Sequence, residues 1–338
     1  MGRALLVGTR KGLFVLHEAE PDWRLSEPLL PGWGVYHAIL DGRDGTLHVC
    51  ANNWVYGATL HSSSDLGGEW RRAEGLDGLN ATWHVEPGAE PGTLWLGADP
   101  GALLRSRDGG ATFETVKGIA EHPTRERWQP GAGGLCCHSI QVSDGRVYAA
   151  ISAAGAFRSD DDGETWKPIN SSVAADFMPD DPYPEVGQCV HKLLAHAGRD
   201  GRLWQQNHCG VYRSDDHGDS WERLDGNGLP SDFGFPVALD PADPDTAFVV
   251  PEVSGEQHFT SDGRLGVYRT DDGGASWTLE TLAEPAWAAV LREATSSDDG
   301  GVYVGTQSGS VFARRDGRWS EIASQLPPIL SVEAADWP

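Results

Sequence analysis

The chain has 338 residues, of which 39% are hydrophobic and 22% are charged, and its formal net charge is −24. An acidic surface repels the phosphates of nucleic acids and of anionic membranes, so we expect neither as a partner. The N-terminal stretch lacks the pattern of a secretory signal, and no apolar run approaches membrane-spanning length, so we expect a cytoplasmic protein. The five cysteines are odd in number and irregularly spaced, which argues against a disulfide framework.

One eight-residue segment recurs along the chain and starts at Ser63, Ser106, Ser159, Ser214 and Thr270. Each copy has Ser or Thr at its first position, Asp two residues later and an aromatic residue at its end. Short polar side chains of this kind hydrogen-bond backbone N–H groups in turns. We therefore interpret the five recurring carboxylates as structural rather than catalytic: Asp65, Asp108, Asp161, Asp216 and Asp272.

This segment resembles the Asp box, also called the BNR repeat, of sialidase-like β-propellers. The resemblance covers nearly the whole chain. In that family the box is a turn between the third and fourth strands of a blade. The resemblance therefore implies a propeller fold, and it raises glycoside hydrolysis as one expected activity.

Seven short hairpins indicate seven repeated units, and they begin at Leu5, Leu47, Leu94, Val147, Leu203, Ala247 and Val302. A further strand is expected before hairpins two to seven, at residues 35–40, 82–87, 138–142, 190–197, 236–240 and 288–293. The first hairpin has no such strand before it, and residues 329–337 can supply one. We therefore predict an all-β, single-domain propeller over residues 1–338, with seven four-stranded antiparallel blades and a ring closed by the C-terminal strand.

Four histidines occupy matching places near the start of the predicted innermost strands of blades two to five: His37, His84, His138 and His191. The face of the ring at which these strands begin is called the histidine face below. Imidazoles that converge on the axis there could hold iron, copper or zinc. The sequence thus predicts a four-histidine transition-metal site at the mouth of the axial channel. The alternative is that a histidine inherited with the repeat only packs structurally.

Three further residues are candidates for catalysis. Glu86 lies two residues after His84, on the same side of the strand, and could orient that ring. His208 and His258 fall in turns between the second and third strands, which belong to the same face. The main hypothesis is therefore a metal-dependent enzyme of the oxidoreductase or oxygenase type that acts on a small-molecule substrate.

Two other functions stay open. A sialidase-like glycoside hydrolase is favoured by the resemblance, but the Phe/Tyr-Arg-Ile-Pro motif of sialidases and a clear arginine triad are missing. Its carboxylate candidates show no spacing that selects a pair, and they are Asp176, Glu185, Asp232 and Glu252. A non-catalytic interaction scaffold is the third hypothesis, and it leaves the matched histidines without a role. The sequence does not indicate an oligomeric state.

Overall fold

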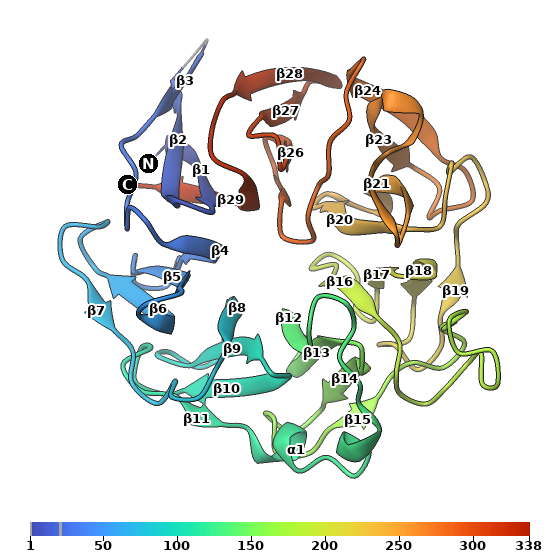
Figure 1. Cartoon of the computed structure of the whole chain (residues 1–338), viewed down its shortest axis with the longest axis horizontal. Helices are drawn as coiled ribbons and strands as arrows, with labels where there is room; N and C mark the ends of the chain where they lie inside the picture. The colour runs from blue at the N-terminus through green and yellow to red at the C-terminus, as the bar shows by residue number, and fades with distance from the viewer. Residues whose placement is uncertain (1, 20–21) are drawn as a thin grey trace.

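The computed structural model describes residues 2–19 and 22–338. Seven antiparallel sheets stand around a common axis, each forming one blade of a propeller (Figure 1). The prediction of a seven-bladed propeller is therefore confirmed. The helical elements in the described part of the chain are the short turns α1 (Lys117–Ala120), η1 (Arg125–Arg127) and η2 (Ser261–Gly263). None of these is long and apolar enough to cross a membrane.

The first three blades have four strands each, which follow one another from the axis outward. Blade one contains β29 (Ile329–Trp337), β1 (Gly2–Thr9), β2 (Gly12–Ala19) and β3 (Asp22–Leu25). Blade two contains β4 (Gly34–Leu40), β5 (Leu47–Asn53), β6 (Gly57–Ser63) and β7 (Arg71–Arg72). Blade three contains β8 (Ala81–Pro87), β9 (Leu94–Asp99), β10 (Ala102–Ser106) and β11 (Glu114–Thr115).

The other four blades follow the same order. Blade four contains β12 (Cys136–Ser143), β13 (Arg146–Ser152), β14 (Gly155–Ser159) and β15 (Lys167–Pro168). Blade five contains β16 (Val190–Ala195), β17 (Leu203–Asn207), β18 (Gly210–Ser214) and β19 (Glu222–Arg223). Blade six contains β20 (Gly234–Asp240), β21 (Asp243–Ser254), β23 (Leu265–Thr270) and β24 (Thr278–Ala283), with the additional β22 (Gln257–Thr260) paired to β21. Blade seven contains β25 (Thr295–Asp298), β26 (Gly301–Gly305), β27 (Val311–Arg315) and β28 (Arg318–Ala323).

The C-terminal strand closes the ring, as the sequence predicts. In Figure 1 the red β29 lies beside the blue β1. The two pair antiparallel along their whole length, from Gly2 opposite Trp337 to Thr9 opposite Ile329. The first blade thus takes its inner strand from the other end of the chain. Because β29 pairs with β1, the edge of β1 that faces the axis is not left without a partner.

The prediction for the inner strand of blade seven was wrong in position. It was placed at residues 288–293, whereas β25 begins at Thr295. Ala288 and Val290 are buried in the core although they lie in the connection between blades, so their apolar pattern imitates a strand. This shift matters for the site because it moves Arg292 and Glu293 to the entrance of the inner strand.

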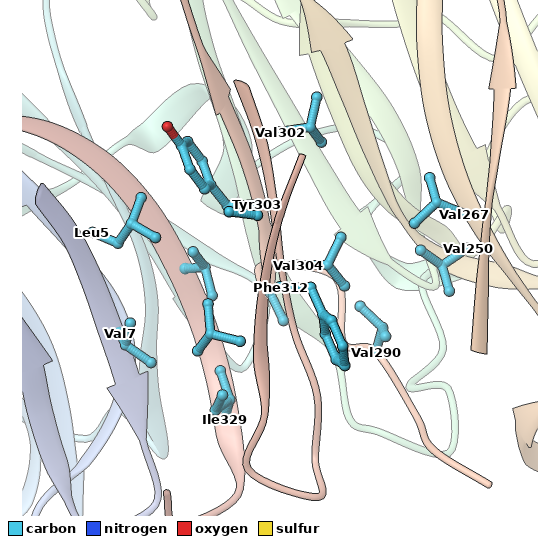
Figure 2. Close-up of a cluster of buried hydrophobic side chains, with 14 of the residues drawn as sticks. Leu5, Val7, Val250, Val267, Val290, Val302, Tyr303, Val304, Phe312 and Ile329 are labelled. Atoms are coloured by element: carbon cyan, nitrogen blue, oxygen red, sulfur yellow. The ribbon is translucent and has the colours of Figure 1, made fainter. Parts of the chain in front are cut away.

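Apolar side chains fill the spaces between neighbouring blades. Figure 2 shows one such cluster, in which Val250 of blade six, Val304 of blade seven and Val7 of blade one belong to a continuous core. Inner and middle strands are buried on both faces because each blade is covered by a neighbour on either side. The channel-facing residues of the inner strands are therefore held by a rigid frame.

The five recurring Ser/Thr-x-Asp turns, called Asp boxes below after their sequence pattern, are held by hydrogen bonds of the recurring Asp. In the turn of blade four, Asp161 Oδ1 accepts hydrogen bonds from Ser159 Oγ at 2.8 Å and from the Thr165 backbone N–H at 2.8 Å. The closing Trp166 is buried against the neighbouring blade, where its ring lies 6.4 Å from that of Trp95. These turns join the third strand to the fourth, so they lie at the end of each blade opposite the histidine face.

Candidate functional site

The structure does not gather the four matched histidines around one point. Among the described residues, two separate groups have donor atoms close enough to share a ligand. One contains His37 and His84 with Glu293, and the other contains His191 with Cys189 and His208. His138 belongs to neither. The single four-histidine centre is therefore corrected to two different clusters. His37 and His84 pair opposite Cys50 and Gly97, and the corresponding places in blades four and five hold Ser139 and Lys192. His138 and His191 lie one residue earlier, at β-bulges, so they occupy a different register position.

The first cluster lies on the axis. The rings of His37 and His84 are stacked, with centroids 4.1 Å apart and planes inclined by 16°. His84 Nδ1 lies 3.3 Å from Glu293 Oε1, and the Lys192 ammonium donates a hydrogen bond to Glu293 Oε2. All four side chains are buried, and they come from blades two, three, five and seven. We call these four residues the axial charge cluster.

The protonation of this cluster follows from its contacts. Burial would lower the pKa of His84, but the neighbouring Glu293 carboxylate overrides it and raises the pKa to about 9. Burial and the charge of His84 hold the pKa of His37 well below 6.5. Burial would raise the pKa of Glu293, yet Lys192 and His84 keep it well below 4.5. At neutral pH the cluster therefore contains the Glu293 carboxylate and one imidazolium, that of His84.

A small axial cavity of about 240 Å³ lies beyond the axial charge cluster, toward the Asp-box face. Glu86 and Glu333 line it, and Glu86 Oε2 is 3.5 Å from His84 Nε2. Burial raises the pKa of Glu333 to about 7. Glu86 thus lies beside His84, as its sequence position suggested. It lines the axial cavity, however, whereas His208 and His258 lie toward the opposite end of the channel, at the histidine face.

His138 and His191 lie outside the axial charge cluster. His138 Nε2 lies 3.2 Å from Ser152 Oγ, while its Nδ1 is buried with no hydrogen-bond partner in the described chain. His191 Nδ1 lies 2.6 Å from the Gly234 carbonyl oxygen. Burial, followed by the nearby Arg292 charge, holds the pKa of both imidazoles well below 6.5. Both rings are therefore neutral at physiological pH.

A cavity of about 800 Å³ opens on the histidine face over blades four to six. Its walls are largely apolar and include Phe177, Met178, Phe233 and Phe235. Three histidines surround the ring of Phe233: His191 at 5.4 Å, His208 at 5.0 Å and His258 at 5.4 Å between ring centroids. His208 and His258 therefore meet at one cavity, which we call the histidine-face cavity.

Arg292 is a cation of this cavity that the sequence patterns did not predict. Its guanidinium carbon lies 5.3 Å from the ring centroid of Trp83 and 5.3 Å from that of Phe235. Its Nε is buried without a hydrogen-bond partner, and no carboxylate of the described residues lies within 4.0 Å of its side-chain nitrogens. A guanidinium held between two aromatic faces and lacking a counter-ion is arranged to receive an anion.

A signal for Arg292 and Glu293 was present in the sequence. His37 and His84 each precede the first residue of the following hairpin by ten residues. The same spacing counted back from Val302 reaches Arg292, with Glu293 next to it. The sequence prediction instead started the inner strand of blade seven at Ala288, because the residues before Arg292 are apolar.

The carboxylates considered for glycoside hydrolysis do not form a pair across a groove. Asp176 and Asp232 both contact Arg223, and Glu185 pairs with Arg127 at 2.7 Å. Glu252 is fully buried, where burial raises its pKa to about 7, and its Oε1 accepts a hydrogen bond from the Val290 backbone N–H at 3.1 Å. Glu252 thus bridges blades six and seven rather than facing solvent.

Comparison with known proteins supports the architecture. No family model matches the chain, and no curated protein matches it. Among solved structures, a GH74 enzyme of Niastella koreensis shares 16% identity at a TM-score of 0.66, covering 97% of this chain and 51% of that one. The GH74 xyloglucanase of Xanthomonas campestris shares 18% identity at a TM-score of 0.63, covering 98% and 52%. YCF48 with a bound D1 peptide shares 14% identity at a TM-score of 0.57, covering 96% and 89%.

These similarities establish a fold. The chain shares its β-propeller fold with these structures, and it spans about half the length of the GH74 structures. At such low identity the neighbours carry no information on which residues act or on what substrate. The metal-dependent oxidoreductase predicted from the histidines has no counterpart among these three structures.

Proposed function

We propose that the protein is an enzyme that binds a small organic anion with an apolar body in the histidine-face cavity. The observation that carries this proposal is Arg292, a guanidinium at the cavity wall with no carboxylate partner among the described residues. Arg292 is half-buried, and a charge held partly out of water without a partner is costly, so its retention is explained by a ligand that supplies the opposite charge. A carboxylate matches the planar donor geometry of arginine best.

The cavity walls define the rest of the ligand. Phe177 and Phe233 are aromatic and Met178 is adaptable, so together they favour a flat or branched apolar group over a sugar. The volume of about 800 Å³ is typical of pockets for molecules of metabolite or drug size. His258 is exposed and faces this cavity, which makes it the candidate group for proton transfer.

Ligand binding tests the proposal directly. A panel of aromatic and aliphatic carboxylates, each paired with its neutral carboxamide, is screened by thermal shift and then by calorimetry. We expect carboxylates alone to bind, and Arg292→Gln to weaken them by about tenfold or more. Arg264→Gln is the matched control, because Arg264 lies on the surface in a pair with Glu284. Equal binding of acids and amides, or full affinity in Arg292→Gln, contradicts the proposal.

A glycoside hydrolase is the second candidate, and the similarity to the two GH74 structures favours it. Among the described residues, Asp181 is the single carboxylate that lines the histidine-face cavity, whereas hydrolysis of a neutral glycan ordinarily needs two. Chromogenic glycosides, including a sialoside and xyloglucan oligosaccharides, test it. Turnover that survives Arg292→Gln would favour this second candidate over the first.

A further inference from the structure

Three metal-ligating side chains converge at the wall of the histidine-face cavity. Cys189 Sγ, a ring nitrogen of His191 and a ring nitrogen of His208 all lie within 4.8 Å of one another. Cys189 and His191 flank the first residue of β16, and His208 lies in the turn between β17 and β18. The His208 backbone N–H donates a 2.9 Å hydrogen bond to the Cys189 carbonyl oxygen, which fixes the turn against the strand.

The surroundings orient two of these three donors. His191 Nδ1 donates to the Gly234 carbonyl oxygen at 2.6 Å, which leaves Nε2 deprotonated and free to coordinate. Ser152 Oγ lies 3.5 Å from Cys189 Sγ and 3.2 Å from His138 Nε2. If His138 donates to Ser152, the serine hydroxyl can donate to the Cys189 sulfur, and this chain of hydrogen bonds orients the sulfur as a ligand. The ring of His208 has no hydrogen bond to any described residue.

We propose that Cys189, His191 and His208 bind Zn²⁺, with the fourth coordination position open to the histidine-face cavity. One thiolate and two imidazoles suit a borderline metal, and three protein ligands with an open position are typical of catalytic rather than structural zinc. The inference deepens the proposed function, because Arg292 lines the same cavity and an anion bound to it would lie beside the metal. The added positive charge increases the selectivity of the cavity for anions.

The axial charge cluster does not support the same inference. His37, His84 and Glu293 are also close enough to share an ion. However, the Lys192 ammonium already donates to Glu293 and supplies the positive charge that a metal would bring. The two groups therefore have different roles, and His191 also differs from His37 and His84 by one residue in register.

Metal analysis and cobalt substitution test the zinc site on the full-length protein. Protein purified from zinc-supplemented cells should contain about one zinc ion per chain. The apoprotein, loaded with Co²⁺, should show the charge-transfer absorption of a thiolate bound to cobalt together with the visible bands of a tetrahedral ion. Absence of the charge-transfer band in the wild-type cobalt protein overturns the proposal, and this measurement requires no variant to fold.

Variants then locate the ligands. Cys189→Ser and His208→Gln should each lower zinc affinity by at least about tenfold. Cys209→Ser is the matched control, because Cys209 adjoins His208 in the chain but lies outside the ligand group. His37→Asn should also keep its zinc, and a loss there would place the metal on the axis and refute the site. Melting temperatures and circular dichroism verify that each variant is folded.

The two proposals can fail independently. Arg292→Gln should lose carboxylate binding and keep zinc. Carboxylate binding that depends on Arg292 in a protein without zinc would leave the proposed function standing and refute the metal site. Zinc that depends on Cys189 in a protein that binds no carboxylate would do the reverse.

Discussion

His84 and Glu293 are 209 positions apart in the chain, yet His84 Nδ1 lies 3.3 Å from Glu293 Oε1 on the propeller axis. The contact joins blade three to blade seven across the ring. Because the carboxylate raises the pKa of His84 from 6.5 to about 9, this pair makes the stability of the ring depend on pH.

The first prediction concerns that dependence. The folded state holds the His84 proton more tightly than the unfolded chain does, so the stabilisation is complete below about pH 6.5 and is lost as the pH rises through about 9. The cost of His84→Gln should therefore fall by about 1–3 kcal/mol between pH 6 and pH 9.5, because each pKa unit corresponds to about 1.4 kcal/mol. Urea unfolding at the two pH values measures it.

His48→Gln is the control for this prediction. His48 is buried in blade two, and burial lowers its pKa to about 4, so it is neutral when folded. Its contribution is complete above about pH 6.5 and is lost on acidification. The cost of this substitution should therefore not change between pH 6.5 and pH 9.5. Identical pH profiles for the two variants would contradict the assignment of a proton to His84.

The second prediction concerns the Lys192–Glu293 pair. Glu293→Leu leaves the Lys192 ammonium buried without its carboxylate and should destabilise the fold by about 3–5 kcal/mol. Combining it with Lys192→Met removes the orphaned charge and should restore a large part of that loss. A double-mutant cycle by urea unfolding at pH 7 measures the coupling. Strictly additive costs would mean that the two side chains do not interact in the folded protein.

The third prediction separates the Asp boxes from function. Asp161→Ala removes the acceptor of hydrogen bonds from Ser159 and Thr165, so it should cost about 1–2 kcal/mol in unfolding free energy. Glu164→Ala, in the same turn, removes a surface ion pair and should change stability by at most about 0.5 kcal/mol. Carboxylate affinity and zinc content should stay at the wild-type level in both. A loss of ligand binding in a folded Asp161→Ala protein would show that the box face contributes to the site.

The fourth prediction concerns ring closure. Deleting residues 329–338 removes the inner strand of blade one, including Ile329 and Val332 from the core between blades seven and one. The edge of β1 and the apolar faces beside it become exposed, so we expect an aggregating protein without a cooperative thermal transition. Deleting Pro338 alone, which follows β29, should leave the melting temperature unchanged. A soluble, cooperatively melting truncation would show that the other six blades are stable without closure.

The fold was predictable from sequence because its repeats are local. Each Asp box is set by side-chain contacts within a few residues, as between Ser159 and Asp161, and each hairpin is marked by its own turn. The closing strand could be placed by counting, since the first hairpin lacked an inner strand. The prediction for blade seven was wrong in the position of its inner strand. Val290 is buried like a strand residue, although it lies in the connection before β25.

The site was less predictable because its contacts cross the ring. The spacing in the sequence marks His37 and His84 as equivalent to His138 and His191, but β-bulges shift the last two by one residue in register. His191 then lines the histidine-face cavity, and His138 belongs to neither group. Lys192 was missed because it takes the register position of His37 and His84, opposite Gln206, while the bulge leaves His191 one residue before it. Zinc binding by Cys189, His191 and His208 stays a prediction.

The axial charge cluster also divides the interior of the ring. His37, His84, Lys192 and Glu293 are all buried on the axis, and the two cavities that they separate share no lining residue. Among the described residues, this cluster therefore stands between the two cavities, and a molecule in the larger cavity approaches from the histidine face. Residues around the opening on that face are then the ones that set how fast ligands exchange.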